Sequence, residues 1–484
     1  MDSVYDKYEA VIGLEVHTQL LTKSKAYCSD INEFGATPNT NIGPVSLGLP
    51  GTLPKANSYT VNYAIRLGLA IGAKITRKMH FDRKNYFYPD LPKGYQITQD
   101  RTPICTGGKV SIKTDDGTGK DIAITRIHME EDAGKSIHDQ DLYDTLVDLN
   151  RAGVPLLEIV SEPEIKTSKE AYNYLMEVRK LVRYLDICDG NLEEGSMRCD
   201  ANISVMLKGA PEFGERCEVK NMNSMRNVQR AIDHEIIRQI DIIENGGHIS
   251  MQTRSFDAVS GTTSLMRSKE EAHDYRYFPE PDLQPLQLSK EYIDEIEKNM
   301  PPLPNALLTK YKTEYALSDY DALNLTESKE IALFFEEITK STDNYKAAAN
   351  WVMGSVKSYL NQNAVEIGDF PLKADKIVEI IQLVDDQKIV NSTAEQRLFP
   401  AMLKNPLESA EKLSEQNGWL LQTDTNELGN LVTSVLEEHP DEFDRLKKGE
   451  KKLIGFFMGQ IMKASKGSAS PKEVTQIISE FIEQ

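Results

Sequence analysis

Residues 10–20 alternate between apolar and polar side chains, which is the pattern of a β-strand with one buried face. In such a strand Ile12 and Leu14 point one way, whereas Glu15 and His17 point the other way. The apolar side can be buried, so the two polar side chains are displayed at a surface or in a cleft. Strand geometry alone does not distinguish a metal site from a solvated strand face.

The alternation of short β-branched runs with helical periodicity predicts an α+β domain over residues 1–292. Helices are expected there at 168–185 and 225–243. Farther along the chain, apolar residues recur at steps of three and four, which predicts helices near 328–338, 344–362 and 374–384. We therefore expect three domains, with helical domains at 293–407 and 408–484 following the first.

Two further strand-like runs deliver carboxylates near their ends. Residues 124–136 carry Glu130, Glu131 and Asp132, and residues 148–163 carry Glu158 and Glu162. Side chains at strand ends reach clefts, and several carboxylates in one cleft repel each other unless a cation holds them. Oxygen ligands with one imidazole suit Mg²⁺ or Mn²⁺ better than zinc. The sequence therefore predicts a Mg²⁺ site that these carboxylates share with the first strand's Glu-x-His pair.

Composition bears on whether the chain binds nucleic acid and on where in the cell it is found. The chain has 484 residues, five cysteines and a formal net charge of −19. With few cysteines, no signal-peptide pattern and no apolar run near ~18 residues, we expect a cytoplasmic protein without a membrane span. An acidic total disfavours nucleic acid, but charge distribution matters more than the sum. A basic stretch near the C-terminus predicts phosphate contacts by Lys447, Lys448, Lys451, Lys452, Lys463 and Lys466.

Seven short blocks resemble successive signature blocks of one family. They are GLEVH (13–17), FDRKNYFYPD (81–90), KGYQ (93–96), HMEEDAGKS (128–136), EEGSMRCDANIS (193–204), DYRYFPEPD (274–282) and GQIMKASKG (459–467). The family is that of the B subunits (GatB) of the tRNA-dependent aspartyl/glutamyl amidotransferase GatCAB. The resemblance implies an α+β fold, with a large mixed α/β cradle domain followed by a helical domain and a small helical tail like YqeY.

The resemblance also implies a ligase that forms a carbon–nitrogen bond with glutamine as amido donor. ATP would phosphorylate the side-chain carboxylate of Glu-tRNA(Gln) and/or Asp-tRNA(Asn), and ammonia would then displace the phosphate. It places Glu15, His17, Glu131 and Glu158 around Mg²⁺, with Glu130 as a neighbour; there the ion would bridge phosphate oxygens. The implied partners are the amidase GatA and the small subunit GatC, in a heterotrimer.

By the same resemblance, Lys84 and Glu131 face each other where ammonia enters from the partner subunit. From composition alone, Lys84 would be a surface cation, since lysines are mostly exposed. None of the five cysteines lies in a recognised nucleophile signature, so glutamine hydrolysis is expected in another chain.

A segment that binds zinc in many relatives differs here. Those relatives carry cysteines at the positions of Cys28, Asp30, Gly43 and Ser46, and only the first is a cysteine in this chain. One thiol cannot make a tetrahedral structural site, so we expect no zinc.

Four more polar residues are candidates to bind ATP or the tRNA acceptor end. Lys220 and Asn221 precede the helix predicted at 225–243, so they could equally help to cap it. Arg254 and Arg267 could equally pair with carboxylates of this acidic chain.

An aromatic platform is a further candidate. Tyr275, Arg276 and Tyr277 could stack on a terminal base or pack in the core.

Two other functions remain open from the sequence. The chain could be a noncatalytic tRNA-binding scaffold, or a stand-alone metal-dependent phosphotransferase that acts on a small carboxylate. The basic tail disfavours the second, because a small substrate needs no basic helical appendage.

Overall fold

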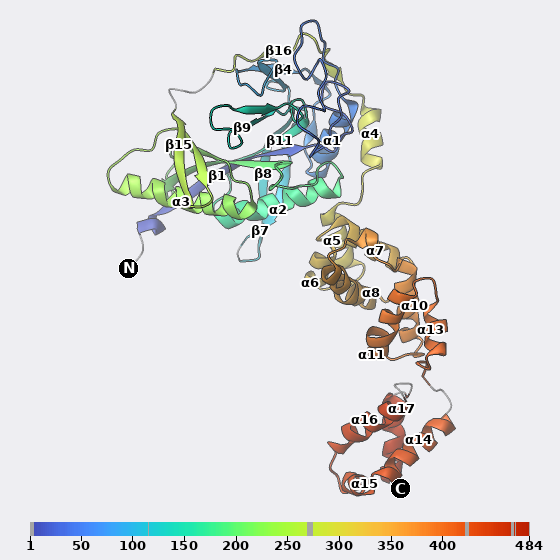
Figure 1. Ribbon diagram of the computed structural model, residues 1–484. Coiled ribbons are helices and arrows are strands. Elements are labelled where there is room, and N and C mark those ends of the chain that lie inside the picture. The colour runs from blue at the N-terminus through green and yellow to red at the C-terminus, as the bar shows by residue number, and fades with distance from the viewer. Residues whose placement is uncertain are drawn as a thin grey trace. The chain divides into compact units, whose positions relative to one another are not determined.

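The computed structural model describes residues 4–114, 116–268, 274–421, 425–465, 469 and 471–483. The chain divides into two compact units, Met1–Leu303 and Pro304–Gln484. The first mixes strands and helices and the second is helical, which confirms the α+β prediction (Figure 1). The finer division into three domains stays a prediction.

The first unit is built on one large sheet. Its strands are β1 (Tyr8–Gln19), β2 (Lys74–Ile75), β6 (Cys105–Thr106), β7 (Lys109–Lys113), β8 (Gly119–Glu131), β11 (Pro155–Ser161), β12 (Met197–Leu207), β13 (Cys217–Lys220), β14 (Gln252–Asp257) and β15 (Thr262–Ser268). They lie in the order β15–β14–β13–β12–β1–β11–β8–β6–β2, with β7 paired to β8. Strands β13 and β14 are parallel, and the other pairs are antiparallel.

Among the described residues, short ladders, four α-helices and the 3-10 helix Val4–Lys7 complete this unit. The ladder strands are β3 (Lys78–Met79), β4 (Asp82–Asn85), β5 (Tyr95–Thr98), β9 (Lys135–Ile137), β10 (Leu146–Asp148), β16 (Phe278–Pro279) and β17 (Leu286–Gln287). The helices are α1 (Ser58–Ala70), α2 (Ser168–Tyr184), α3 (Met225–Glu244) and α4 (Lys290–Lys298). Helices α2 and α3 confirm the segments predicted at 168–185 and 225–243.

The hydrophobic core lies between the sheet and helices α1, α2 and α3. On β1, Ile12 and Leu14 are fully buried, as their alternation predicts, and they belong to one cluster with Tyr174 and Val178 of α2. Helices α2 and α3 run along one face of the sheet (Figure 1). The helix-covered face is therefore apolar, and the ionisable side chains of the same strands lie on the other face.

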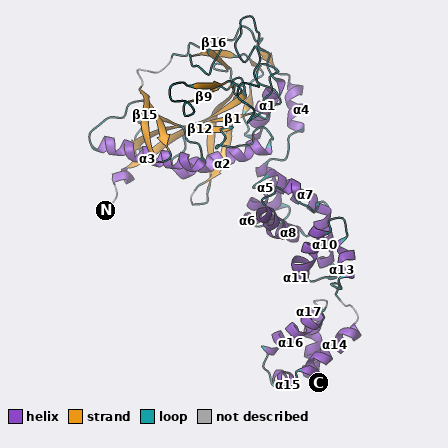
Figure 2. Cartoon of the chain, in the orientation of Figure 1, coloured by secondary structure: helices purple, strands orange, loops and turns teal. Residues whose placement is uncertain are grey.

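The second unit consists of helices (Figure 2). The first nine in order are α5 (Pro304–Thr313), α6 (Asp319–Leu325), α7 (Lys329–Thr339), α8 (Tyr345–Trp351), α9 (Lys357–Asn363), α10 (Ala374–Asp385), α11 (Asn391–Thr393), α12 (Phe399–Lys404) and α13 (Ala410–Gln416). The helix predicted at 344–362 comprises α8, a π-helical stretch at Val352–Val356 and α9. Helix α13 packs against α10, where the Ala410 amide donates to Glu379 at 2.7 Å.

The C-terminal helices have a core of their own. They are α14 (Thr425–Glu438), α15 (Pro440–Lys447), α16 (Leu453–Ala464) and α17 (Pro471–Glu483). Val432, Phe457 and Ile478 are buried together in this cluster. Among the described residues, no helix combines the length and apolarity that crossing a bilayer requires.

Candidate active site

Strand register brings ionisable residues together on the uncovered face of the sheet. His17 on β1 lies opposite Glu158 on β11 and opposite Arg198 on β12. Glu158 in turn lies opposite His128 on β8. Directly paired residues share a face of an antiparallel ladder, so these four side chains form one row across neighbouring strands.

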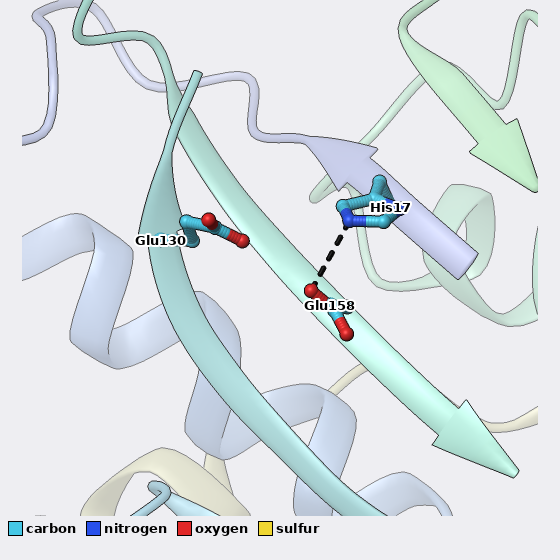
Figure 3. A group of neighbouring side chains, drawn as sticks. All are labelled: His17, Glu130 and Glu158. Carbon is cyan, nitrogen blue, oxygen red and sulfur yellow. Dashed lines mark ion pairs between the residues drawn. The ribbon is translucent and has the colours of Figure 1, made fainter. Parts of the chain in front are cut away.

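Glu158 is the centre of this row. Its Oε2 lies 3.1 Å from Nε2 of His17 and 3.3 Å from Nε2 of His128. Glu130, two residues beyond His128 on β8, points into the same space (Figure 3). His17, Glu130 and Glu158 each offer one atom that could bind a metal ion, and these three atoms lie within 4.8 Å of one another. This is the mixed carboxylate and imidazole set that the sequence predicts for a divalent cation.

Burial and neighbouring charge set the protonation of the row. Burial by itself would raise the pKa of Glu158, but the imidazoles of His128 and His17 outweigh it and hold that pKa well below its usual value. Burial would lower the pKa of His17, and the Glu158 carboxylate reverses the sign, so this pKa is raised. Glu158 is therefore an anion at neutral pH and available as a ligand.

A second acidic group lies beside the first but already contains a cation. Carboxylate oxygens of Glu15, Asp200 and Glu218 lie within 4.8 Å of one another. The ammonium of Lys220 is 2.8 Å from Glu218 and also pairs with Asp200. Burial, followed by the charge of Glu158, raises the pKa of Glu15. The group around Glu158 also offers the imidazole of His17, so it matches the predicted mixed set of carboxylate and imidazole ligands more closely.

Glu130 and Glu131 have different surroundings because adjacent strand residues point to opposite faces. Lys84 lies 3.3 Å from Glu130. Glu131 instead pairs with Lys93 and accepts a 2.9 Å hydrogen bond from the amide of Ile97. The structure therefore does not bring Glu131 into the cluster, and it corrects the expected pairing of Lys84 with Glu131 to a pairing with Glu130.

The two candidate arginines lie on opposite faces of the sheet. Arg254 on β14 lies opposite the fully buried Val219, and its guanidinium donates to Thr263 at 2.9 Å and lies 3.7 Å from the buried Glu235. Arg254 therefore lies beneath the sheet, that is, on its helix-covered face, and does not reach the cleft. Arg267 lies on the cleft side.

Asn221 follows β13 with a left-handed backbone, at a φ of 67°. Its side chain donates to Ser255 at 2.9 Å, and it lines the part of the cleft beside Lys220.

Sequence reasoning named Asp132 as a candidate ligand but missed its partner Arg198. Asp132, which is buried, accepts hydrogen bonds from Gln19 and Arg198, both at 2.9 Å. Burial would raise the pKa of Asp132, but Arg198 and Arg151 lower it below its usual value. The signal in the sequence was the period-two recurrence of Arg198 and Asp200 in β12, which marks them as one face.

An open cleft of about 790 Å³ lies on this face of the sheet. Its floor is the ionisable face of the sheet, and its lining includes Glu15, His17 and Glu158, with Tyr86 and Tyr275 at one side.

The remaining candidates lie outside this cleft. In the segment that departs from the zinc-binding pattern, Asp30 accepts from the amide of Gly43 at 2.8 Å and from the hydroxyl of Ser46, and Cys28 Sγ lies 3.5 Å from Ser46 Oγ. The tail lysines that the structure describes are all exposed: Lys447, Lys448, Lys451, Lys452 and Lys463. Lys466 lies outside the described residues.

A helix-backed sheet with an ionisable cleft defines the first unit as a candidate catalytic domain. The model of the GatB/GatE catalytic domain matches residues 10–294, and that of the GatB domain matches residues 333–482. The chain therefore belongs to the GatB family.

Curated relatives are named as the B subunit of aspartyl/glutamyl-tRNA(Asn/Gln) amidotransferase. The protein from Thermodesulfovibrio yellowstonii is 48% identical over 99% of this chain and 100% of its own length. The protein from Syntrophotalea carbinolica is 47% identical over 98% of each chain. That from Alkalilimnicola ehrlichii is 46% identical over 99% of this chain and 100% of its own length.

The placement of the two arginines predicts different effects of the same substitution. Arg254→Met removes hydrogen bonds beneath the sheet and leaves buried polar partners unsatisfied, so it should lower the free energy of unfolding by about 1–3 kcal/mol. Arg267→Met should change that free energy much less, because Arg267 lies at the solvated cleft. Urea titration of both variants measures the difference; equal losses of stability would contradict the assigned faces.

Proposed function

We propose that this chain activates the side-chain carboxylate of Glu-tRNA(Gln) and/or Asp-tRNA(Asn) with ATP, and that it amidates the product with ammonia from a partner amidase. The observation that carries the proposal is the cluster of His17, Glu130 and Glu158, in which His17 and Glu158 line the cleft and Glu130 lines the pocket that adjoins it at His17. Membership of the GatB family supports the substrate class and the ligase chemistry.

The chemistry explains why phosphorylation precedes amidation. A carboxylate is a poor electrophile, because loss of an oxide ion from it is prohibitive. Attack of the carboxylate oxygen on the γ-phosphorus of ATP forms an acyl phosphate and releases ADP. Ammonia then attacks the acyl carbon, phosphate leaves with the electron pair of the broken carbon–oxygen bond, and loss of a proton gives the neutral amide.

The residues of the cluster fit Mg²⁺, and His17, Glu130 and Glu158 would hold it. Carboxylates outnumber ammonium groups here, since Lys84 approaches only Glu130 in this group. When bound, Mg²⁺ would neutralise charge on the transferring phosphoryl group and align the reactants. His128 would position Glu158, to which its Nε2 is directed at 3.3 Å. Glu15, from the neighbouring group, would border the same site.

Arg267, Lys220 and Asn221 are candidates to contact ATP or the acceptor end at the other parts of the cleft. Lys220 is less available than a free lysine because Asp200 and Glu218 already hold its ammonium. Burial would lower the pKa of Lys220, but these two carboxylates raise it, so the group stays charged.

Ammonia is expected from another chain. Burial raises the pKa of all five thiols, to about 12 for Cys105 and Cys188 and to about 11 for Cys217, so they are poor nucleophiles at neutral pH. An amidase of the GatA type, joined by a GatC subunit in a cytoplasmic heterotrimer, would supply it.

We infer that Lys84 controls the entry of ammonia, and its contact with Glu130 supports this role. Burial would lower the pKa of its ammonium, but the carboxylate of Glu130 reverses the shift and raises it. The charged pair that Lys84 forms with Glu130, at the edge of the cluster, would separate the reacting centre from a polar passage to the partner.

The cluster predicts a loss of activation that spares glutamine hydrolysis. Glu158→Gln and His17→Ala should each lower tRNA-dependent ATP hydrolysis and amidation by roughly 100-fold or more, since each removes a ligand of the metal that stabilises transferring charge. Glutaminase activity of the assembled complex should persist. Glu297→Gln, at an exposed position of α4, is the matched control. Amidation at wild-type rates in both cluster variants at limiting Mg²⁺ would rule out the assignment.

The Lys84–Glu130 pair predicts a dependence on the nitrogen donor. Lys84→Ala should reduce glutamine-driven amidation more than amidation driven by added ammonium chloride, because free ammonia can reach the cleft from solvent. The ratio of the two rates, compared with that of the wild type, is the measurement. If both rates fell equally, Lys84 would serve the phosphoryl-transfer step or the fold.

The exposed tail lysines predict a salt-dependent contribution to tRNA binding. Replacing Lys447, Lys448, Lys451 and Lys452 together by Gln should raise the KM for charged tRNA, and each lost phosphate contact should reduce the slope of log affinity against log salt by about 1. The control replaces Lys290 and Lys298 of α4 by Gln. Unchanged KM and salt slope would reassign the tail to assembly or structure.

A further inference from the structure

Four tyrosines form a continuous aromatic wall on one side of the cleft. Tyr86, Tyr88, Tyr275 and Tyr277 all line it. Their rings contact edge to face, with centroids 5.8 Å apart for Tyr86 and Tyr88, and 6.0 Å apart for both Tyr86 with Tyr275 and Tyr275 with Tyr277. Two of these tyrosines follow β4 and two precede β16, so the wall joins segments that are far apart in the sequence.

The pairing of β4 with β16 holds these segments together (Figure 1). The Asn85 amide donates to the carbonyl of Tyr275 at 2.9 Å, and its side chain donates to the carbonyl of Arg276, also at 2.9 Å. Arg276 has a left-handed backbone, with a φ of 47°. A non-glycine residue keeps this conformation only where its surroundings impose it, so the wall is a preformed surface.

The wall is open to a ligand. Tyr88 is 55% exposed and Tyr277 is 36% exposed, although both are large aromatic side chains. The ammonium of Lys84 lies 5.2 Å from the ring centroid of Tyr275, which links the wall to the pair formed with Glu130. The wall therefore stands next to the centre at which we place phosphoryl transfer.

Charge decides which part of a substrate suits this wall. The floor of the cleft carries the carboxylates of Glu15, Glu158 and Asp200, which repel phosphate groups that bring no cation. A neutral planar base has no such penalty, and aromatic side chains bind bases through stacking.

We propose that the wall formed by Tyr86, Tyr88, Tyr275 and Tyr277 binds the adenine ring of a substrate. The inference rests on the proposed function, in which two adenosines reach this cleft: that of ATP and the 3′-terminal adenosine of the charged tRNA. Stacking of either one fixes the attached reactive group relative to Glu158, so the wall is a substrate-binding surface beside the metal cluster.

The test uses the assembled amidotransferase with Tyr88→Leu and Tyr275→Leu, each compared with its Phe counterpart. Tyr88 is more than half exposed, so its replacement leaves the core intact. Tyr143→Leu, in the loop between β9 and β10 and 94% exposed, is the control outside the cleft. One arm measures the affinity for a non-hydrolysable ATP analogue. The other compares an acceptor-stem RNA ending in CCA with the same RNA ending in CC.

The Leu variants should lose about fivefold or more in affinity in one arm, whereas the Phe variants keep the stacking face and the affinity. Loss only with the ATP analogue assigns the wall to ATP; loss only with the RNA ending in CCA assigns it to the acceptor end. Unchanged affinities in both arms, or equal losses in the Phe and Leu variants, would overturn the proposal. Absence of tRNA-dependent ATP hydrolysis in the wild-type complex would instead refute the proposed function.

Discussion

The contact of one carboxylate with two imidazoles organises the candidate active site. Glu158 lies between His17 and His128 in the interior of a sheet, where an unpaired carboxylate would be costly to bury. The contact exists because three strands present these residues in register, and that register is held by the apolar face beneath, where Ile12 and Leu14 are fully buried. The hydrophobic core and the polar site are therefore two sides of the same strands.

Charge is distributed in the cleft so that its parts are not equivalent. Lys220 pairs with Asp200 and Glu218, and Arg198 pairs with Asp132, whereas Glu158 is flanked by two imidazoles. A divalent cation is a natural counterpart of carboxylates combined with imidazole. The aromatic side of the cleft has no comparable need of a cation, so a phosphate-bearing ligand and a base would be accommodated in different places.

The net charge of the chain is a poor guide to whether it can bind RNA. The chain carries −19 overall, yet the described lysines of the C-terminal helices are exposed beside a separate small core. Local potential within about 10 Å governs contacts at physiological salt, so an acidic chain can carry a locally basic cluster of lysines.

The sequence by itself determined the elements, because their periodicities are local. Alternation predicted the buried side of β1, and helical periodicity predicted α2 and α3 and, in the second unit, α7, α10 and the stretch of α8 and α9. The motifs also led to the family. Only the tertiary structure decided between Glu130 and Glu131, gave Lys84 its partner and placed Arg254 beneath the sheet. A shift of one residue exchanges the two faces of a strand, and the face is set by pairing and packing with distant segments.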